Sequence, residues 1–257
     1  MAKTDEFWYE DKVLKSYVED DIAVIKIKCH VFDAITDLAE SGKFISFFNI
    51  AERNPDIKAL LLINEGGCYN EEEYDKFLKG LMEPDKDGSS PEGTRTYFES
   101  IDRTRQINIL NRVITQMVEF KKIIVMGLKQ NVVTPFFGAG LAADFRFASE
   151  DMSYSLAHLK YGIHPGGALP FFLPRYIGHS KATEILFSRE EISAQEAKEL
   201  GLVSKILPVE DFEQHCLAEI HKLCKLDHRV IHTTKLLLNY SRRELHEYFD
   251  IESALIH

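Results

Sequence analysis

The stretch at residues 122–208 constrains the fold more than any other part of the chain. It opens with an apolar run at 123–128, short enough for a buried strand, and an apolar, glycine-bearing patch follows at 134–140. A second strand-like run covers 145–148. The order strand, tight turn, helix, strand is how α/β folds place a ligand against a helix N-terminus. The segment therefore predicts an α/β domain with a ligand site near the start of the helix that ends near Asp144.

Apolar periodicity predicts the other elements. In the run at 22–29 one face is apolar throughout, whereas the other face begins with Ile22 and Val24 and continues with Lys26 and Lys28. We expect this strand to be buried on both sides at its start and half-exposed at its end. The remaining expected elements, in chain order, are a strand at 13–18 that forms a hairpin with 22–29, a helix at 32–51, a buried strand at 58–63, a helix at 97–120, and C-terminal helices at 212–226, 230–240 and 243–256.

Charge and composition exclude several classes of protein. The formal net charge is −10, and no basic run offsets it, which argues against a nucleic-acid surface. The longest apolar patch, 132–143, is too short to cross a bilayer and contains proline and glycine. The N-terminus lacks the apolar core of a signal peptide, and the four cysteines lack CxxC spacing, as suits a reducing compartment. We expect a cytoplasmic protein that binds neither nucleic acid nor membrane.

One group of residues has the chemistry of a metal site. On a helix, His221 and Cys224 share a face, but His215 and Cys216 point in different directions. The group is either a metal site or a mixed helix surface. We favour the mixed surface and predict no metal.

The motif at 192–203, I-S-A-Q-E-A-K-E-L-G-L-V, follows the pattern I-S-A-x-E-A-x-x-x-G-L-V. Further matches are Pro165-Gly166-Gly167, Gly178 with Ser180-Lys181-Ala182, and Asp144 with Ala148 four residues later. On these residues the chain resembles the crotonase superfamily, the enoyl-CoA hydratases and isomerases, and is identified as a divergent member. The resemblance implies an α/β fold, a crotonase-like spiral of ββα units at 1–208, with a helical C-terminal oligomerisation region at 209–257. It also implies a homotrimer or a dimer of trimers.

The resemblance assigns an oxyanion hole to two backbone amides. In the family, two N–H groups hold the thioester oxygen while an enolate forms. The first maps to Glu73, in an acidic loop where Glu72 replaces the family glycine. The second maps to Pro135, which has no N–H, within Thr134-Pro135-Phe136 in place of three glycines. Either Gly138-Ala139-Gly140 has taken over the turn through a local shift, or the oxyanion hole is incomplete.

The two acid/base carboxylates of a typical hydratase are also replaced. One position falls on Gly138, which has no side chain, and the other falls on His158. A histidine can perform general acid/base catalysis near neutral pH. His158 is therefore either the catalytic residue or a structural histidine bonded to backbone groups beside the pocket.

The resemblance suggests further binding residues. Phe136 and Phe137, with Phe171 and Phe172, either line an acyl pocket or pack in the core. Gly138, Tyr161 and His164 are assigned to the substrate, and the loop at 82–96 resembles the family's lid. Lys235 either approaches the CoA phosphates or is a solvated lysine. No cofactor is implied beyond coenzyme A as part of the substrate.

Two functions follow as hypotheses. The first is an enzyme that acts on an acyl thioester, of CoA or of an acyl-carrier protein, by enolate-stabilised lyase or isomerase chemistry such as isomerisation or decarboxylation. Members that decarboxylate carrier-bound thioesters in polyketide β-branching resemble this chain at Lys160-Tyr161-Gly162, and fatty-acid metabolism is the other setting. The second is a catalytically degenerate crotonase-fold protein that acts as a binding or assembly subunit.

Overall fold

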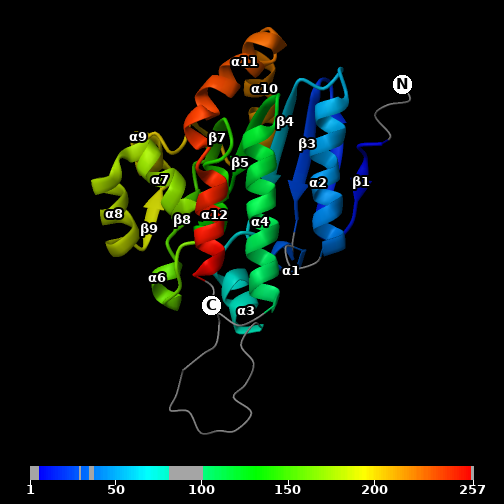
Figure 1. Cartoon of the computed structure of the whole chain (residues 1–257). Coiled ribbons are helices and arrows are strands. Elements are labelled where there is room, and N and C mark those ends of the chain that lie inside the picture. Colours follow the sequence, from blue (N-terminus) through cyan, green and yellow to red (C-terminus); the bar gives the residue numbers. More distant parts are fainter. Residues whose placement is uncertain (1–5, 29, 35–37, 81–100, 256–257) are drawn as a thin grey trace, which may run out of the picture.

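The chain folds around a seven-stranded mixed sheet (Figure 1). The computed structural model describes residues 6–28, 30–34, 38–80 and 101–255, so the expected lid at 82–96 lies outside the described residues. The strand order is β1-β2-β3-β4-β5-β7-β10, antiparallel in the first two pairs and parallel from β3 onward. The bounds are β1 Tyr9–Glu10, β2 Leu14–Glu19, β3 Ile22–Ile27, β4 Ala59–Asn64, β5 Ile123–Leu128, β7 Phe145–Ser149 and β10 Lys205–Leu207. The predicted α/β class is confirmed.

Strand β3 shows why the sheet forms where the sequence predicts it. Ala23 and Ile25 lie in the apolar layer on one face of the sheet, and Ile22 and Val24 lie in the layer on the other face. Lys26 is only half-buried. Successive side chains of a strand point to opposite faces, so a strand that is apolar on both faces must be covered on both. The expected burial and the hairpin with β2 are both confirmed.

Helices cover both faces of the sheet. On one face, α2 (Leu38–Arg53) and α4 (Ile101–Glu119) lie side by side (Figure 1) and contribute Phe48 and Ile114 to the apolar layer. On the other face, α10 (Phe212–Leu223) contributes Phe212 and Ile220. The helix expected at 32–51 appears as α1 (Val31–Ala34) and α2, with 35–37 outside the described residues.

The chain also forms a second, smaller sheet of three strands. Its order is β6-β8-β9, with β6 Asn131–Val133, β8 Ser153–Ser155 and β9 Glu191–Ser193. The helices around it are α5 Thr134–Gly140, α6 His158–Tyr161, α7 Leu169–Ile177, α8 His179–Ser188 and α9 Ala194–Glu199. Ligands of open α/β sheets bind beyond the carboxyl ends of the strands. Here β4 leads to α3 (Glu71–Gly80), and β5 leads through β6 to α5.

The motif that matches the family pattern most specifically is a structural one. Ile192 is fully buried in β9, and the hydroxyl of Ser193 accepts the N–H of Glu196 at 3.2 Å as the N-cap of α9. The Glu196 carboxylate accepts two bonds from Arg189, at 2.7 and 2.8 Å. The motif therefore sets a strand-to-helix junction.

The C-terminal helices continue from α10. They are α11 (His228–Leu238), a 3₁₀ turn η1 (Asn239–Arg242) and α12 (Leu245–Ala254). The last of them packs against α4, as Figure 1 shows. The three predicted C-terminal helices are thus confirmed, with the third beginning two residues later than expected.

Candidate functional site

The first expected amide donor lies in the first turn of α3. The acidic stretch expected to be a loop begins this helix at Glu71, where carboxylates favour the positive end of the helix dipole. The N–H of Glu73 donates to Oδ1 of Asn70 at 2.9 Å. Asn70 therefore caps α3, and the amide assigned to the thioester oxygen is bonded to this capping side chain.

The second expected donor position lies in the first turn of α5. Pro135 is tolerated there because the first N–H groups of a helix have no partner within it. Gly138 and Gly140 both lie inside α5 and are buried. The alternative that Gly138-Ala139-Gly140 has taken over the turn is therefore wrong, and position 135 keeps its place without an N–H.

An aromatic cluster joins the two segments that carry these positions. The rings of Tyr69 and Phe136 stack with 4.0 Å between their centroids, and Phe32 packs 5.1 Å from Phe136. The carbonyl of Tyr69 accepts the N–H of Val133 at 2.9 Å, which brings the start of α5 beside the residues before α3. All three rings are buried, and those of Tyr69 and Phe136 border a small apolar cavity between α2, α4 and the sheet.

Two glycines bring the turn at 165–167 against α5. A Cβ at Gly138 would lie 2.3 Å from the carbonyl oxygen of Gly167. Gly167 has a φ of +70°, and a Cβ there would lie 2.0 Å from the carbonyl oxygen of Pro135. These contacts are with backbone, which cannot rotate away. The first carboxylate position of a hydratase therefore has no room for any side chain, let alone a carboxylate.

His158 is held by two hydrogen bonds in a buried position, with 3% of its surface exposed. Nε2 lies 3.0 Å from the carbonyl oxygen of Leu186, and Nδ1 lies 3.2 Å from Oγ1 of Thr134. A carbonyl only accepts, so Nε2 carries the proton, and Nδ1 faces the Thr134 hydroxyl, which also lies 3.2 Å from the carbonyl oxygen of Ser155. Burial lowers the pKa of His158, opposed by the Leu186 carbonyl. Of the two alternatives, these contacts favour the structural histidine, which ties α5 and α8 to α6.

The depressed pKa predicts a pH-dependent contribution of His158 to stability. Below pH 6.5, the ordinary pKa of histidine, the imidazole of the unfolded chain binds a proton more readily than the buried imidazole of the folded chain. The free energy of unfolding of the wild type, relative to that of His158→Gln, should therefore fall as the pH drops from about 7 to about 5. Urea titrations at several pH values measure the difference. A difference that is constant across this range contradicts the assignment.

Polar residues meet beside α3, among them Tyr161, which the resemblance assigns to the substrate, and Ser155 and Glu71, which no motif indicates. The hydroxyl of buried Ser155 donates to Glu71, and the ammonium of Lys160 lies 3.1 Å from the same carboxylate. Tyr161 meets Tyr74 edge to face, and burial and the nearby Asp75 carboxylate raise the pKa of Tyr161. Ser155 and Glu71 are 84 positions apart, so no local pattern indicates the pair. The one feature of the sequence that could have indicated this pair is Glu71 itself, a long acidic side chain at a position where the family usually has a small residue.

The other expected binding residues are dispersed. Phe137 is fully buried and stacks on Tyr154 at 3.8 Å, and Phe171 and Phe172 are also core residues. Phe136 borders an apolar cavity of about 70 Å³ between α2, α4 and the sheet. His164 is half-buried. The burial of Phe137, Phe171 and Phe172 therefore supports the core alternative for these three residues, whereas Phe136 borders a cavity.

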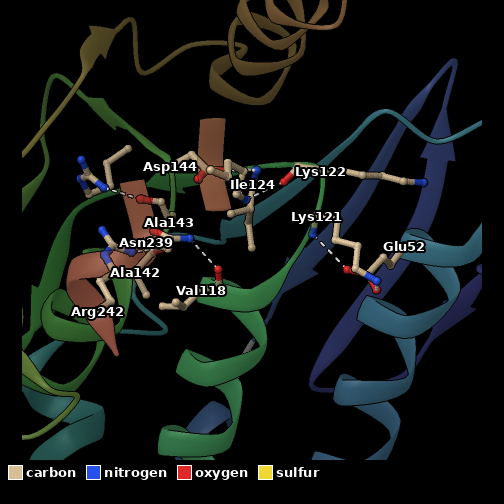
Figure 2. Close-up of polar contacts among 12 residues, drawn as sticks. Glu52, Val118, Lys121, Lys122, Ile124, Ala142, Ala143, Asp144, Asn239 and Arg242 are labelled. Carbon is tan, nitrogen blue, oxygen red and sulfur yellow. Dashed lines mark hydrogen bonds and ion pairs between the residues drawn. The ribbon is translucent and has the colours of Figure 1, made fainter. Parts of the chain in front are cut away.

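Lys235 is only 8% exposed and is not a solvated lysine. Its ammonium lies 2.7 Å from Oδ2 of Asp144 and 2.7 Å from the carbonyl oxygen of Lys122. Burial lowers the pKa of Lys235, opposed by the Asp144 charge. Asp144 also accepts the N–H of Ile124 at 2.8 Å, beside it in Figure 2. Lys235 thus fastens α11 to the core, and its ammonium is engaged there and not directed at a phosphate.

The four residues weighed as a metal group do not converge. Cys216 and Cys224 are buried in the layer between α10 and the sheet, whereas His221 lies 3.4 Å from Asp21 near the surface. Across the described ranges no group of three or more His, Cys, Asp or Glu side chains is placed to hold a metal. Nor does any described helix have the length and apolarity to span a membrane.

Comparison with known proteins gives one consistent result. The family profile described as "Enoyl-CoA hydratase/isomerase" matches residues 106–257. A probable enoyl-CoA hydratase of Mycobacterium tuberculosis is 29% identical over 135 residues, which cover 52% of this chain and 47% of that protein. One of Bacillus subtilis is 37% identical over 111 residues, covering 42% and 43%. The matched part thus spans about half the length of these curated relatives.

Solved structures resemble this chain over nearly its whole length. The enoyl-CoA hydratase of Bacillus halodurans has a TM-score of 0.75 at 18% identity and covers 94% of this chain and 92% of that one. The enoyl-CoA hydratase/isomerase of Cupriavidus metallidurans CH34 has a TM-score of 0.71 at 21% identity, covering 96% and 89%. Because the identities are this low, the likeness shows the fold alone.

Proposed function

Because this chain belongs to the enoyl-CoA hydratase/isomerase family, we propose that it is a catalytically degenerate member that serves as a binding or assembly subunit. The observation that carries the proposal is the contact between Gly138 and the backbone of Gly167, which leaves no space for a catalytic carboxylate. Hydration needs a positioned acid and base as well as donors for the developing oxyanion. Position 135 lacks an N–H, and the N–H of Glu73 is bonded to Asn70.

The rival hypothesis, a lyase or isomerase that uses His158, requires rearrangements that the contacts oppose. One ring nitrogen of His158 would have to give up its hydrogen bond to Thr134 or to Leu186. The stacked rings of Tyr69 and Phe136 would also have to separate. An acyl thioester remains the class of ligand that family membership favours for either function. CoA and an acyl-carrier protein present the same thioester.

The test uses the purified full chain with crotonyl-CoA as an enoyl-thioester probe. We expect no hydration above the rate in buffer. The variant Pro135→Gly restores an N–H at the second donor position, and we expect it to be equally inactive because no acid or base occupies position 138. Hydration by the wild type that is lost in His158→Ala would overturn the proposal and support the enzyme hypothesis.

We also propose that the protein forms a homotrimer or a dimer of trimers through α11. Val230, Leu237 and Leu238 share one face of the helix at 59%, 76% and 69% exposure. An exposed apolar stripe of this kind is typical of an interaction site. Leu238→Glu should dissociate the assembly in analytical ultracentrifugation, while Phe187→Glu, which removes an equally exposed ring from α8, should leave it intact. A wild type that sediments as a monomer contradicts the proposal.

A further inference from the structure

A large groove lies between the end of α4 and the C-terminal helices. Its volume is about 620 Å³, and its walls come from the last turn of α4, α11, η1 and the start of α12. These elements lie at the end of the sheet where β5 begins, whereas α3 and α6 lie at the opposite end (Figure 1). A concave site of about 300–1,000 Å³ is of the size that holds a small molecule. We call this feature the basic groove.

Its charge is opposite to that of the whole protein. The charged side chains that line it are the cations Lys121, Lys235, Arg242 and Arg243 and a single acid, Glu119. Lys121 pairs with Glu52 at 3.4 Å and Lys235 pairs with Asp144 at 2.7 Å, so the positive charge available to a ligand is that of Arg242 and Arg243. The protein as a whole carries a formal charge of −10. A concentration of cations on an acidic protein creates a local potential that attracts anions.

Arg242 is held in place by groups that leave its charge uncompensated. One nitrogen lies 3.2 Å from the carbonyl oxygen of Ala142, and the other lies 3.3 Å from the hydroxyl of Tyr176. The guanidinium also lies over the ring of Phe172, 5.1 Å from its centroid. Figure 2 shows the side chain beside Ala142 and Ala143. All three contacts are to neutral groups, so an oriented guanidinium keeps its full charge for a ligand, the arrangement that favours phosphate recognition.

Other contacts remove competing negative groups. Asp144 is engaged with Lys235 and with the N–H of Ile124. The side-chain amide of Asn239 donates to the carbonyl oxygen of Val118 at 2.7 Å, at the end of α4 (Figure 2). This bond covers a C-terminal helix carbonyl that would otherwise repel an anion. Arg243 lies flat on the ring of Tyr240, 3.7 Å from its centroid, so an aromatic surface stands next to the second guanidinium.

From this geometry we propose that the basic groove binds an aromatic phosphomonoester, with the phosphoryl group on Arg242 and Arg243 and the ring against Tyr240 and the apolar floor formed by Phe120, Leu236 and Leu245. The mixture of a few charged groups and an apolar lining is that of a small-molecule site. The proposal uses no residue from the region between α3 and α5, so it does not rest on the proposed loss of catalysis. Leu237, in the wall of the groove, also lies on the α11 face proposed as the subunit interface.

Calorimetric titration of the full chain with 5′-AMP, phenyl phosphate, adenosine and inorganic phosphate tests the site. We expect saturable binding of 5′-AMP or phenyl phosphate, at least about tenfold tighter than that of adenosine or inorganic phosphate, and weakened by salt. Tighter binding of 5′-AMP identifies a nucleotide site, and equal binding identifies a general aryl phosphate site; either result supports the proposal. Inorganic phosphate binding as tightly as the esters, or no saturable binding of either ester, overturns it.

Substitutions of single arginines test whether the phosphomonoester binds in the basic groove. Arg243→Gln, at an exposed position, and Arg242→Gln should each weaken the binding of the phosphomonoester about tenfold. The matched control is Arg189→Gln, which removes a guanidinium paired with Glu196 outside the groove and should leave the affinity unchanged. Unaltered affinity in Arg243→Gln, or an equal loss in Arg189→Gln, overturns the assignment even if Arg242→Gln fails to fold.

Discussion

Gly138→Ala is expected to lower the free energy of unfolding by about 3 kcal/mol or more, the upper end of the range for overpacked cores. The added Cβ would lie 2.3 Å from the carbonyl oxygen of Gly167 and 2.8 Å from the backbone nitrogen of Leu169. Side chains can change rotamer to relieve such a clash, but two backbone segments cannot. The helix α5 and the turn at 165–167 would have to separate. Urea denaturation followed by circular dichroism measures the loss.

Gly140 offers a matched control in the same helix. A Cβ there meets only Sδ of Met126, at the ordinary contact distance of 3.5 Å. Gly140→Ala should therefore leave stability unchanged or raise it by up to about 1 kcal/mol, since alanine is the better helix former. If Gly138→Ala is as stable as Gly140→Ala, the close approach of α5 to Gly167 is absent in solution. Position 138 would then have room for a hydratase carboxylate.

Lys235→Met should cost about 3 kcal/mol of stability. It removes the cation from a pair whose side chains are 10% and 21% exposed, and it leaves Asp144 and the Lys122 carbonyl without their partner. Removing one member of a buried ion pair leaves an uncompensated charge and typically costs 3–5 kcal/mol. We take the lower end because Asp144 keeps some contact with water and with the N–H of Ile124.

Two comparisons separate this effect from a general loss of charge. Lys205→Met breaks an ion pair with Glu219 in which the lysine is 47% exposed, and should cost about 1 kcal/mol or less. The double variant Lys235→Met, Asp144→Asn should recover part of the loss, because it removes the unpaired carboxylate. A cost for Lys235→Met no greater than that for Lys205→Met would contradict the buried pair. Lys235 would then again be a candidate for an external phosphate.

The regular elements could be predicted because their signals are local. The alternation in β3 shows both of its faces without reference to any other strand. Asp227 caps α11 by accepting the N–H groups of Arg229 and Val230, whereas the side chain of Asp211 does not cap α10. The resemblance predicts a loop at the acidic stretch before Tyr74, because the family has a loop there. The helix α3 that forms instead is consistent with the capping side chain of Asn70 and the three acids in its first turn.

Within the candidate site, the sequence predicted the positions of the changes but not their surroundings. A proline at 135 lacks an N–H and a glycine at 138 lacks a side chain in any structure, so these two departures from the family pattern were visible from the start. Whether His158 faces a ligand or the protein interior depends on Thr134 and Leu186, which lie 24 and 28 positions away. Periodicity carries no information on such pairs.

The amino-acid sequence by itself determined the family, the order of the elements and the chemical groups missing from the family's catalytic positions, because backbone propensity and side-chain identity are properties of the residues. The tertiary structure alone decided that Gly167 closes the space beside Gly138, that Tyr69 stacks on Phe136, and that Lys235 pairs with Asp144 across 91 positions. These outcomes depend on distances of a few ångströms between segments remote in the chain. Only close packing of the whole core sets those distances.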